Sequence, residues 1–184
     1  MRKKRIRYAD DDITPVRVLF KLRTPSLVVG LVLGLVMSFI TSRFEEALLE
    51  NIALAFFLPL IVYLSDAIGT QTQTIYARDL RTGKASFKRY LIKETFLGIF
   101  WGLAFSIISS LVIFIWFKSI TLTLTVGIST FFAVATAPLI ALIITKAIYS
   151  YREDPAIGSG PIATVIQDVV SIVIYGYVAS AIIL

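Results

Sequence analysis

The sequence predicts an all-α membrane protein with five transmembrane helices, and three observations support this fold class. The chain is 57% hydrophobic and only 16% charged, whereas soluble domains average about 45–50% and about 25%. Several apolar runs reach the length of about 18 residues that indicates a membrane-spanning helix. The Lys and Arg residues concentrate on one predicted side of these runs. We therefore expect a multi-pass protein of the cell membrane, surrounded by the lipid bilayer.

The five spans follow the apolar runs in order. We expect them at about residues 27–40 with flanking extensions, 52–75, 91–117, 120–148 and 161–184. Lys118 and Ser119 should form a short turn between the third and fourth spans. Pro161 should lie in the first turn of the fifth span, where proline is tolerated. Residues 1–25 are expected to form a basic cytoplasmic segment, and residues 26–184 the five-helix transmembrane domain.

The distribution of charge predicts the orientation. Eight Lys and Arg residues precede the first span, six surround the loop between the second and third, and two lie between the fourth and fifth. Sixteen of the eighteen positive residues thus share one side, which the positive-inside bias makes cytoplasmic. The loop with Glu45, Glu46 and Glu50 is acidic and should lie outside. The N-terminus is therefore expected inside and the C-terminus outside.

The residue types that the chain lacks restrict its chemistry. There is no cysteine and no histidine, which excludes disulfides, thiolate metal sites and imidazole bases. Any metal site must therefore use oxygen ligands, as hard ions such as Mg2+ prefer. The net charge of +6 does not indicate a nucleic acid partner, because the positive residues are placed as a topology signal.

Two of the expected spans carry stripes of polar residues. In the fifth span these residues recur at helical spacing, which places them on one face: Thr164, Asp168, Ser171 and Tyr175. A similar stripe in the second span comprises Asp66, Gly69 and Gln73, with Ser65 and Thr72 beside it. Each stripe contains one carboxylate inside the hydrocarbon, where a charge costs roughly 2.5–3.5 kcal/mol. Such a group faces water, finds a partner or binds an ion, so both aspartates are candidate cation ligands.

Their depths allow the two aspartates to share a cavity. Asp168 lies seven residues from Pro161, or about 10 Å along a helix. Asp66 lies ten residues from Tyr76, or about 15 Å. Both depths are measured from the expected cytoplasmic end. We therefore expect one cavity between the second and fifth spans.

These two spans also carry motifs that resemble a known family. The second contains Pro59-Leu60-Ile61, Gly69-Thr70-Gln71 and Arg78-Asp79-Leu80, followed by Gly83. The fifth contains Asp154-Pro155-Ala156, Ser159-Gly160-Pro161, Thr164 and Asp168, with fourteen residues from the first aspartate to the last. This pattern resembles the transmembrane domain of the MgtE magnesium channels and their eukaryotic solute-carrier relatives. The resemblance extends over essentially the whole chain from about Val18.

The resemblance implies a homodimer that moves Mg2+ or a similar divalent cation along its two-fold axis. The second and fifth spans of each protomer would line the pore. The implied metal ligand is Asp168, and the implied pore-lining residues are Thr164, Ser171, Gly69, Gln73 and Ser65. Asp66 is added as a candidate metal ligand because of its place in the polar stripe of the second span. The cytoplasmic mouth would contain Asp154, Ser159, Gly160 and Pro161.

The sequence departs from the family pattern in two places. The MgtE channels carry a large magnesium-sensing region before the membrane domain, whereas about two dozen residues precede the first span here. Regulation would then require a separate protein. The family's Gly-Gly-Asn in the second span is replaced by Ser65-Asp66-Ala67, which adds an acid and removes an amide.

Two other classes of function compete with cation transport. Two aspartates on two spans could form the catalytic dyad of an intramembrane protease. Such proteases carry Gly-x-Gly-Asp and Tyr-Asp motifs, and neither motif surrounds Asp66 or Asp168. We therefore do not expect an enzyme. A membrane subunit that transports nothing and anchors a partner through its basic N-terminus remains the alternative.

The predicted topology can be tested with a reporter fused after Leu184. An odd number of spans with a cytoplasmic N-terminus should place the reporter outside the cell, where alkaline phosphatase is active and green fluorescent protein is not. A reporter fused at the loop near Gly83 should behave in the opposite way. A cytoplasmic signal after Leu184 would contradict the five-span topology.

Overall fold

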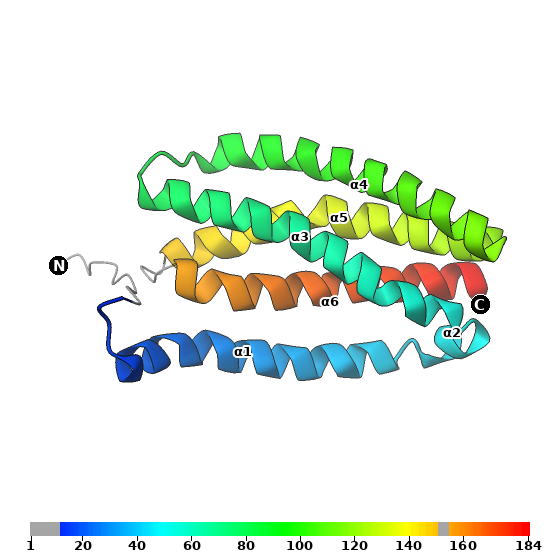
Figure 1. The fold of residues 1–184 in the computed structure, drawn as a ribbon, viewed down its shortest axis with the longest axis horizontal. Coiled ribbons are helices and arrows are strands. Elements are labelled where there is room, and N and C mark those ends of the chain that lie inside the picture. The colour runs from blue at the N-terminus through cyan, green and yellow to red at the C-terminus, as the bar shows by residue number, and fades with distance from the viewer. Residues whose placement is uncertain (1–11, 151–154) are drawn as a thin grey trace.

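The computed structural model describes residues 12–150 and 155–184, and the described part is helical with no strand. The helices are α1 (Val16–Ser42), α2 (Glu45–Glu50), α3 (Ala53–Arg81), α4 (Phe87–Phe117), α5 (Ile120–Ser150) and α6 (Pro155–Ile183). The five long helices lie roughly side by side, and the short α2 joins α1 to α3 at one end of the bundle (Figure 1).

All helices except α2 are long and apolar enough to cross a membrane. The start of α1 and the end of α6 lie at opposite ends of the bundle (Figure 1), as five successive crossings require. The described chain therefore confirms the predicted all-α fold with five spans. The protein is a multi-pass membrane protein of the cell membrane.

Several boundaries differ from the predicted ones. Helix α1 begins at Val16 and continues through Pro25, so it includes part of the segment assigned to the N-terminus. The predicted outer loop forms the short helix α2. Helix α6 begins at Pro155 and contains Pro161 in its interior. The expectation that Pro161 starts the last helix was therefore wrong, because Pro155 takes the first position, where no backbone donor is needed. Lys118 and Ser119 form the expected turn, in which Lys118 is left-handed (φ 51°).

Helix α5 is the centre of the bundle. It packs against α3, α4 and α6, whereas α1 packs chiefly on α6. In the most apolar 18-residue stretch of α5, half of the residues are buried, compared with 6% in the corresponding stretch of α1. The large exposed side chains of α1, such as Leu31 and Phe39, are apolar and suit contact with lipid. Helices α3 and α6 thus both pack on α5 and also contact each other.

Small residues let α4 approach α5 closely. A Cβ atom added to Gly98 would lie 2.8 Å from the Ala135 carbonyl oxygen, and one added to Gly102 would lie 2.9 Å from the Phe131 carbonyl oxygen. In addition, the Ser106 hydroxyl donates a hydrogen bond of 2.7 Å to the Gly127 carbonyl oxygen. Membrane helices are commonly held by such small residues and interhelical hydrogen bonds.

Gly98→Ala should destabilise the bundle, because the new methyl group would press on the backbone of α5. Overpacking of this kind costs about 1–3 kcal/mol, which should appear as a lower midpoint in thermal unfolding of the purified protein. Gly34→Ala is the matched control, since a Cβ atom at Gly34 meets nothing within 4 Å. Equal midpoints for the two variants would show that α4 and α5 can separate without cost.

Candidate functional site

The polar residues of α3 and α6 face each other across the contact between these antiparallel helices. Gly69 lies opposite Gln167, and the Gln73 amide nitrogen donates a hydrogen bond of 3.2 Å to the Ser159 hydroxyl. Asp66 and Asp168 lie within electrostatic range of each other. The two expected stripes are thus adjacent. The structure brings together the two aspartates that the sequence singled out.

The two aspartates have few partners within the protomer. The Asp66 carboxylate accepts a long hydrogen bond of 3.4 Å from the Thr70 hydroxyl. One carboxyl oxygen of Asp168, Oδ1, is buried and has no hydrogen-bond partner. Both side chains are only partly buried. Because a buried polar atom without a partner costs about 1–3 kcal/mol, this oxygen is suited to a ligand that supplies positive charge or a donor.

Further unpaired polar atoms lie close along the same contact. They are Gln73 Oε1, both amide atoms of Gln167 and Ser171 Oγ, all of them buried. Most buried polar groups in proteins are paired, and exceptions call for water, an ion or a functional explanation. A run of unpaired oxygen and amide groups beside two carboxylates therefore marks this part of the α3–α6 contact as polar and able to hold a hydrated ion.

Gln167 is a site residue that the sequence analysis missed. Its carboxamide occupies the space beside Gly69, so that a Cβ atom at position 69 would collide with it. Gln167 lies three residues after Thr164 and four before Ser171, so helical spacing places it at the edge of the predicted stripe, although the prediction did not include it. Gly69 on the opposite helix was a further signal, because a residue without a side chain leaves space that a side chain of the facing helix can fill.

A second set of polar residues lies on the exposed side of α3; its Thr70 and Gln71 belong to the motif quoted above, and only Thr74 was missed. Thr70 and Thr74 follow Asp66 at steps of four, and both are exposed in the isolated protomer. Gln71 is exposed on the same helix. The four residues carry polar groups on a surface at membrane depth, next to the α6 contact. Polar groups at such a depth rarely face lipid.

The remaining predicted lining residues have distinct surroundings. Thr164 is partly buried and Ser171 is buried. The Ser65 hydroxyl donates to the Ala133 carbonyl oxygen of α5 at 3.2 Å, so its polar atom is used in packing α3 on α5. The α6 stripe ends at Tyr175, whose hydroxyl donates to the Leu54 carbonyl oxygen at 2.7 Å. This bond fixes the far end of α6 to the start of α3.

The residues predicted for the cytoplasmic mouth lie where α6 begins. Ser159 is buried beneath Gln73, and a Cβ atom at Gly160 would lie 3.6 Å from the Gln73 amide nitrogen. Pro161 faces α1, since a Cβ atom on Gly30 would lie 3.9 Å from it. Asp154 lies outside the described residues. The Gln73–Ser159 bond therefore closes the α3–α6 contact at this end of the protomer.

The described residues of one protomer provide few ligands for a metal ion. They contain no group of three or more acidic side chains that could hold a metal. Two carboxylates with neighbouring hydroxyl and amide groups cannot replace the water shell of a small divalent ion. They can bind an ion that keeps most of its water, as Mg2+ commonly does.

The part of the chain that contains this site is similar to one family of known proteins. A family model described as a divalent cation transporter, MgtE, matches residues 58–178. A magnesium transporter MgtE of Bacillus subtilis is 33% identical over 162 residues, which cover 86% of this chain. Proteins of the same name from Enterococcus faecalis and Thermus thermophilus are 28% and 29% identical over 86% and 88% of it.

The matched region is a part of these relatives and contains the whole of the polar contact described above. The alignments cover 36% of the length of each relative. The family match extends from α3 to α6 and so includes both aspartates and Gln167. The family is one of transporters and not of enzymes. The chain belongs to the MgtE family of divalent cation transporters.

Proposed function

We propose that this chain moves divalent cations across the membrane, with Mg2+ as the expected cargo. One observation carries the proposal: Asp66 and Asp168 lie within electrostatic range of each other inside the span, and one Asp168 oxygen is buried without a partner. The family and the names of the relatives support the same cargo. Those relatives are longer proteins, of which this chain aligns with 36%.

The charge of the two aspartates is available to a cation. Neither carboxylate forms an ion pair in the part of the chain that the structure describes. The cost of keeping them ionised at membrane depth falls when a divalent ion binds between them. Hydroxyl and amide groups nearby, including those of Thr164 and Gln167, would hydrogen-bond to the water that the ion retains. On this proposal the pore recognises a hydrated ion and not a bare one.

We further propose that two protomers form the pore together. The exposed polar residues Thr70, Gln71 and Thr74 of α3 would face lipid in a single protomer, which is unfavourable. A second protomer placed on a two-fold axis beside α3 and α6 would cover them. It would also add a second Asp66 and a second Asp168, which gives four carboxylates around one hydrated path.

Asp168→Asn should reduce divalent cation flux by at least roughly tenfold, because the loss of a charged hydrogen-bonding group costs about 1.5–3 kcal/mol. The amide keeps the size of the side chain but not its charge. Flux is measured as Mg2+ uptake into liposomes that contain the purified protein and an indicator dye. Glu50→Gln, the same change at an exposed site in α2, should leave flux unchanged. Wild-type flux in Asp168→Asn would refute the assignment.

The proposed dimer can be tested by cross-linking without background, because the chain has no cysteine. Thr70→Cys should form a disulfide-linked dimer when membranes are treated with a mild oxidant, since the residue would lie near the two-fold axis. Ile107→Cys is the control, because Ile107 is 66% exposed on α4, away from the α3–α6 contact. A non-reducing gel separates the products. Equal cross-linking at both positions, or none at Thr70→Cys, would contradict the proposed arrangement.

A further inference from the structure

A second polar cleft lies between α3 and α4, at the end of the bundle that carries the loop of residues 82–86. Its volume is about 350 Å³, and its charged walls are formed by Asp79, Lys84, Arg89, Lys93 and Glu94. Helices α3 and α4 both pack on α5 but make little contact with each other, which leaves this seam open. No residue of α6 lines the cleft, and the cleft has no part in the proposed ion path.

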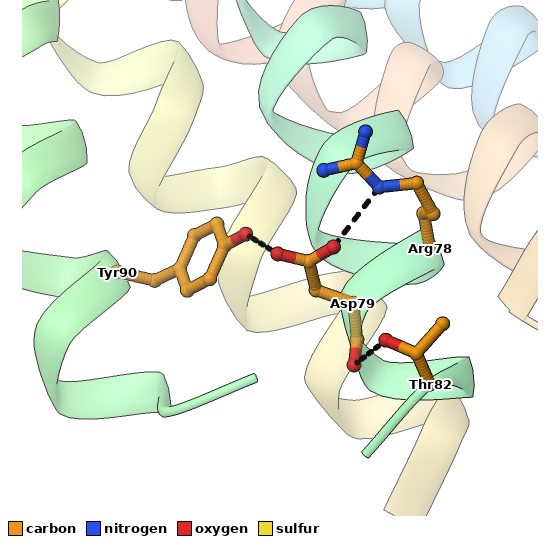
Figure 2. Close-up of polar contacts among 4 residues, drawn as sticks. All are labelled: Arg78, Asp79, Thr82 and Tyr90. Atoms are coloured by element: carbon orange, nitrogen blue, oxygen red, sulfur yellow. Dashed lines mark hydrogen bonds and ion pairs between the residues drawn. The ribbon is translucent and has the colours of Figure 1, made fainter. Parts of the chain in front are cut away.

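The charges of the cleft do not cancel one another. Asp79 accepts hydrogen bonds from Arg78 Nε at 2.9 Å and from the Tyr90 hydroxyl at 2.6 Å (Figure 2). Glu94 accepts a hydrogen bond of 2.7 Å from the Thr72 hydroxyl. Both carboxylates are thus engaged by groups outside the trio of cations.

The three cations of the cleft are Lys84, Arg89 and Lys93. All three residues are exposed, and their side chains form no ion pair or hydrogen bond within the described residues. Lys84 interacts electrostatically with Asp79, but three positive charges against two carboxylates that already accept hydrogen bonds give the cleft affinity for an anion.

The loop that carries Lys84 is held in place. The backbone nitrogens of Lys84 and Ala85 donate to the Asp79 carbonyl oxygen at 3.0 and 3.2 Å. The Thr82 hydroxyl donates to the same oxygen (Figure 2). The Tyr90 bond to Asp79 joins the start of α4 to the end of α3. The cations are therefore presented by an ordered framework.

The walls of the cleft change from charged to apolar toward the middle of the membrane. On α4, Arg89, Lys93 and Leu97 follow one another at steps of four and share a face. Leu97 is 46% exposed, and Ile75 on the α3 side is 42% exposed. A soluble anion would gain nothing from this apolar end, whereas a phospholipid would place its headgroup among the cations and its acyl chains along the exposed seam.

We propose that this cleft binds the headgroup of an anionic phospholipid from the bilayer leaflet at this end of the bundle. Each Lys or Arg near an anionic membrane surface contributes about 1 kcal/mol of attraction, and here three of them surround one pocket. Phosphatidylglycerol is the probe that we would use, with phosphatidylcholine of the same acyl chains as the neutral comparison.

The test is native mass spectrometry of the full 184-residue chain, purified in a non-ionic detergent and titrated with each lipid. The wild-type protein should bind one phosphatidylglycerol per protomer more tightly than phosphatidylcholine. The triple variant K84Q/R89Q/K93Q should bind phosphatidylglycerol roughly 10- to 100-fold more weakly. The control R17Q/K21Q/K88Q removes the same charge from exposed residues outside the cleft and should bind like the wild type. Equal weakening in both variants would overturn the site.

Two further outcomes would assign the cleft to another occupant and overturn the proposal. Displacement of phosphatidylglycerol by its deacylated headgroup at the same concentration would identify a soluble phosphate compound as the ligand. Loss of dimers in the cleft variant, with lipid binding retained, would identify a second copy of the chain. The same spectra report both, because they record the oligomeric state together with the bound mass.

Discussion

The cost of a carboxylate in hydrocarbon is the constraint on which the arrangement of α3 and α6 depends. An isolated Asp66 or Asp168 on a lipid-facing helix would be unfavourable by several kcal/mol. The fold reduces this cost by placing the two helices against each other, so that each aspartate lies among polar neighbours instead of alkyl chains. The same arrangement leaves one Asp168 oxygen unpaired. A site that is fully satisfied by its own protein would have no affinity for a passing ion.

Helix α5 supports this arrangement, and several of its buried hydroxyls are bonded within the helix itself. The hydroxyls of Thr125 and Ser129 bond to carbonyl oxygens four residues earlier, at 2.9 and 2.6 Å. These residues are buried and small, so other helices can approach them closely. Further hydroxyls of α5 bond in the same way, whereas those of Thr130 and Thr145 are buried without a partner among the described residues. The most buried helix thus lies in the centre of the bundle, and the candidate ion ligands lie on two of the helices packed around it.

The sequence predicted the helices more accurately than it predicted which residues contact one another. Apolar runs of sufficient length identified all five spans, because a membrane helix must be long and apolar. Helix ends were less accurate: α6 begins at Pro155, since a turn of helix outside the hydrocarbon needs no apolar residues. Helical spacing identified Asp66, Gly69 and Gln73 as one face of α3, and Gly69 and Gln73 do contact α6. Spacing says nothing about the facing helix, so it could not show that Gln167 fills the gap at Gly69. The orientation and the roles of the aspartates remain predictions.

The contact between Gly69 and Gln167 has a consequence for how this protein can diverge. The absence of a side chain at position 69 is what gives the carboxamide of Gln167 its place. A larger residue at 69 is compatible with the same helix separation only if residue 167 becomes smaller or turns elsewhere. The two positions should therefore vary jointly among descendants of this sequence, although 98 residues separate them in the chain. A substitution at position 69 in α3 would thus be accompanied by a substitution at position 167, next to Asp168 of α6.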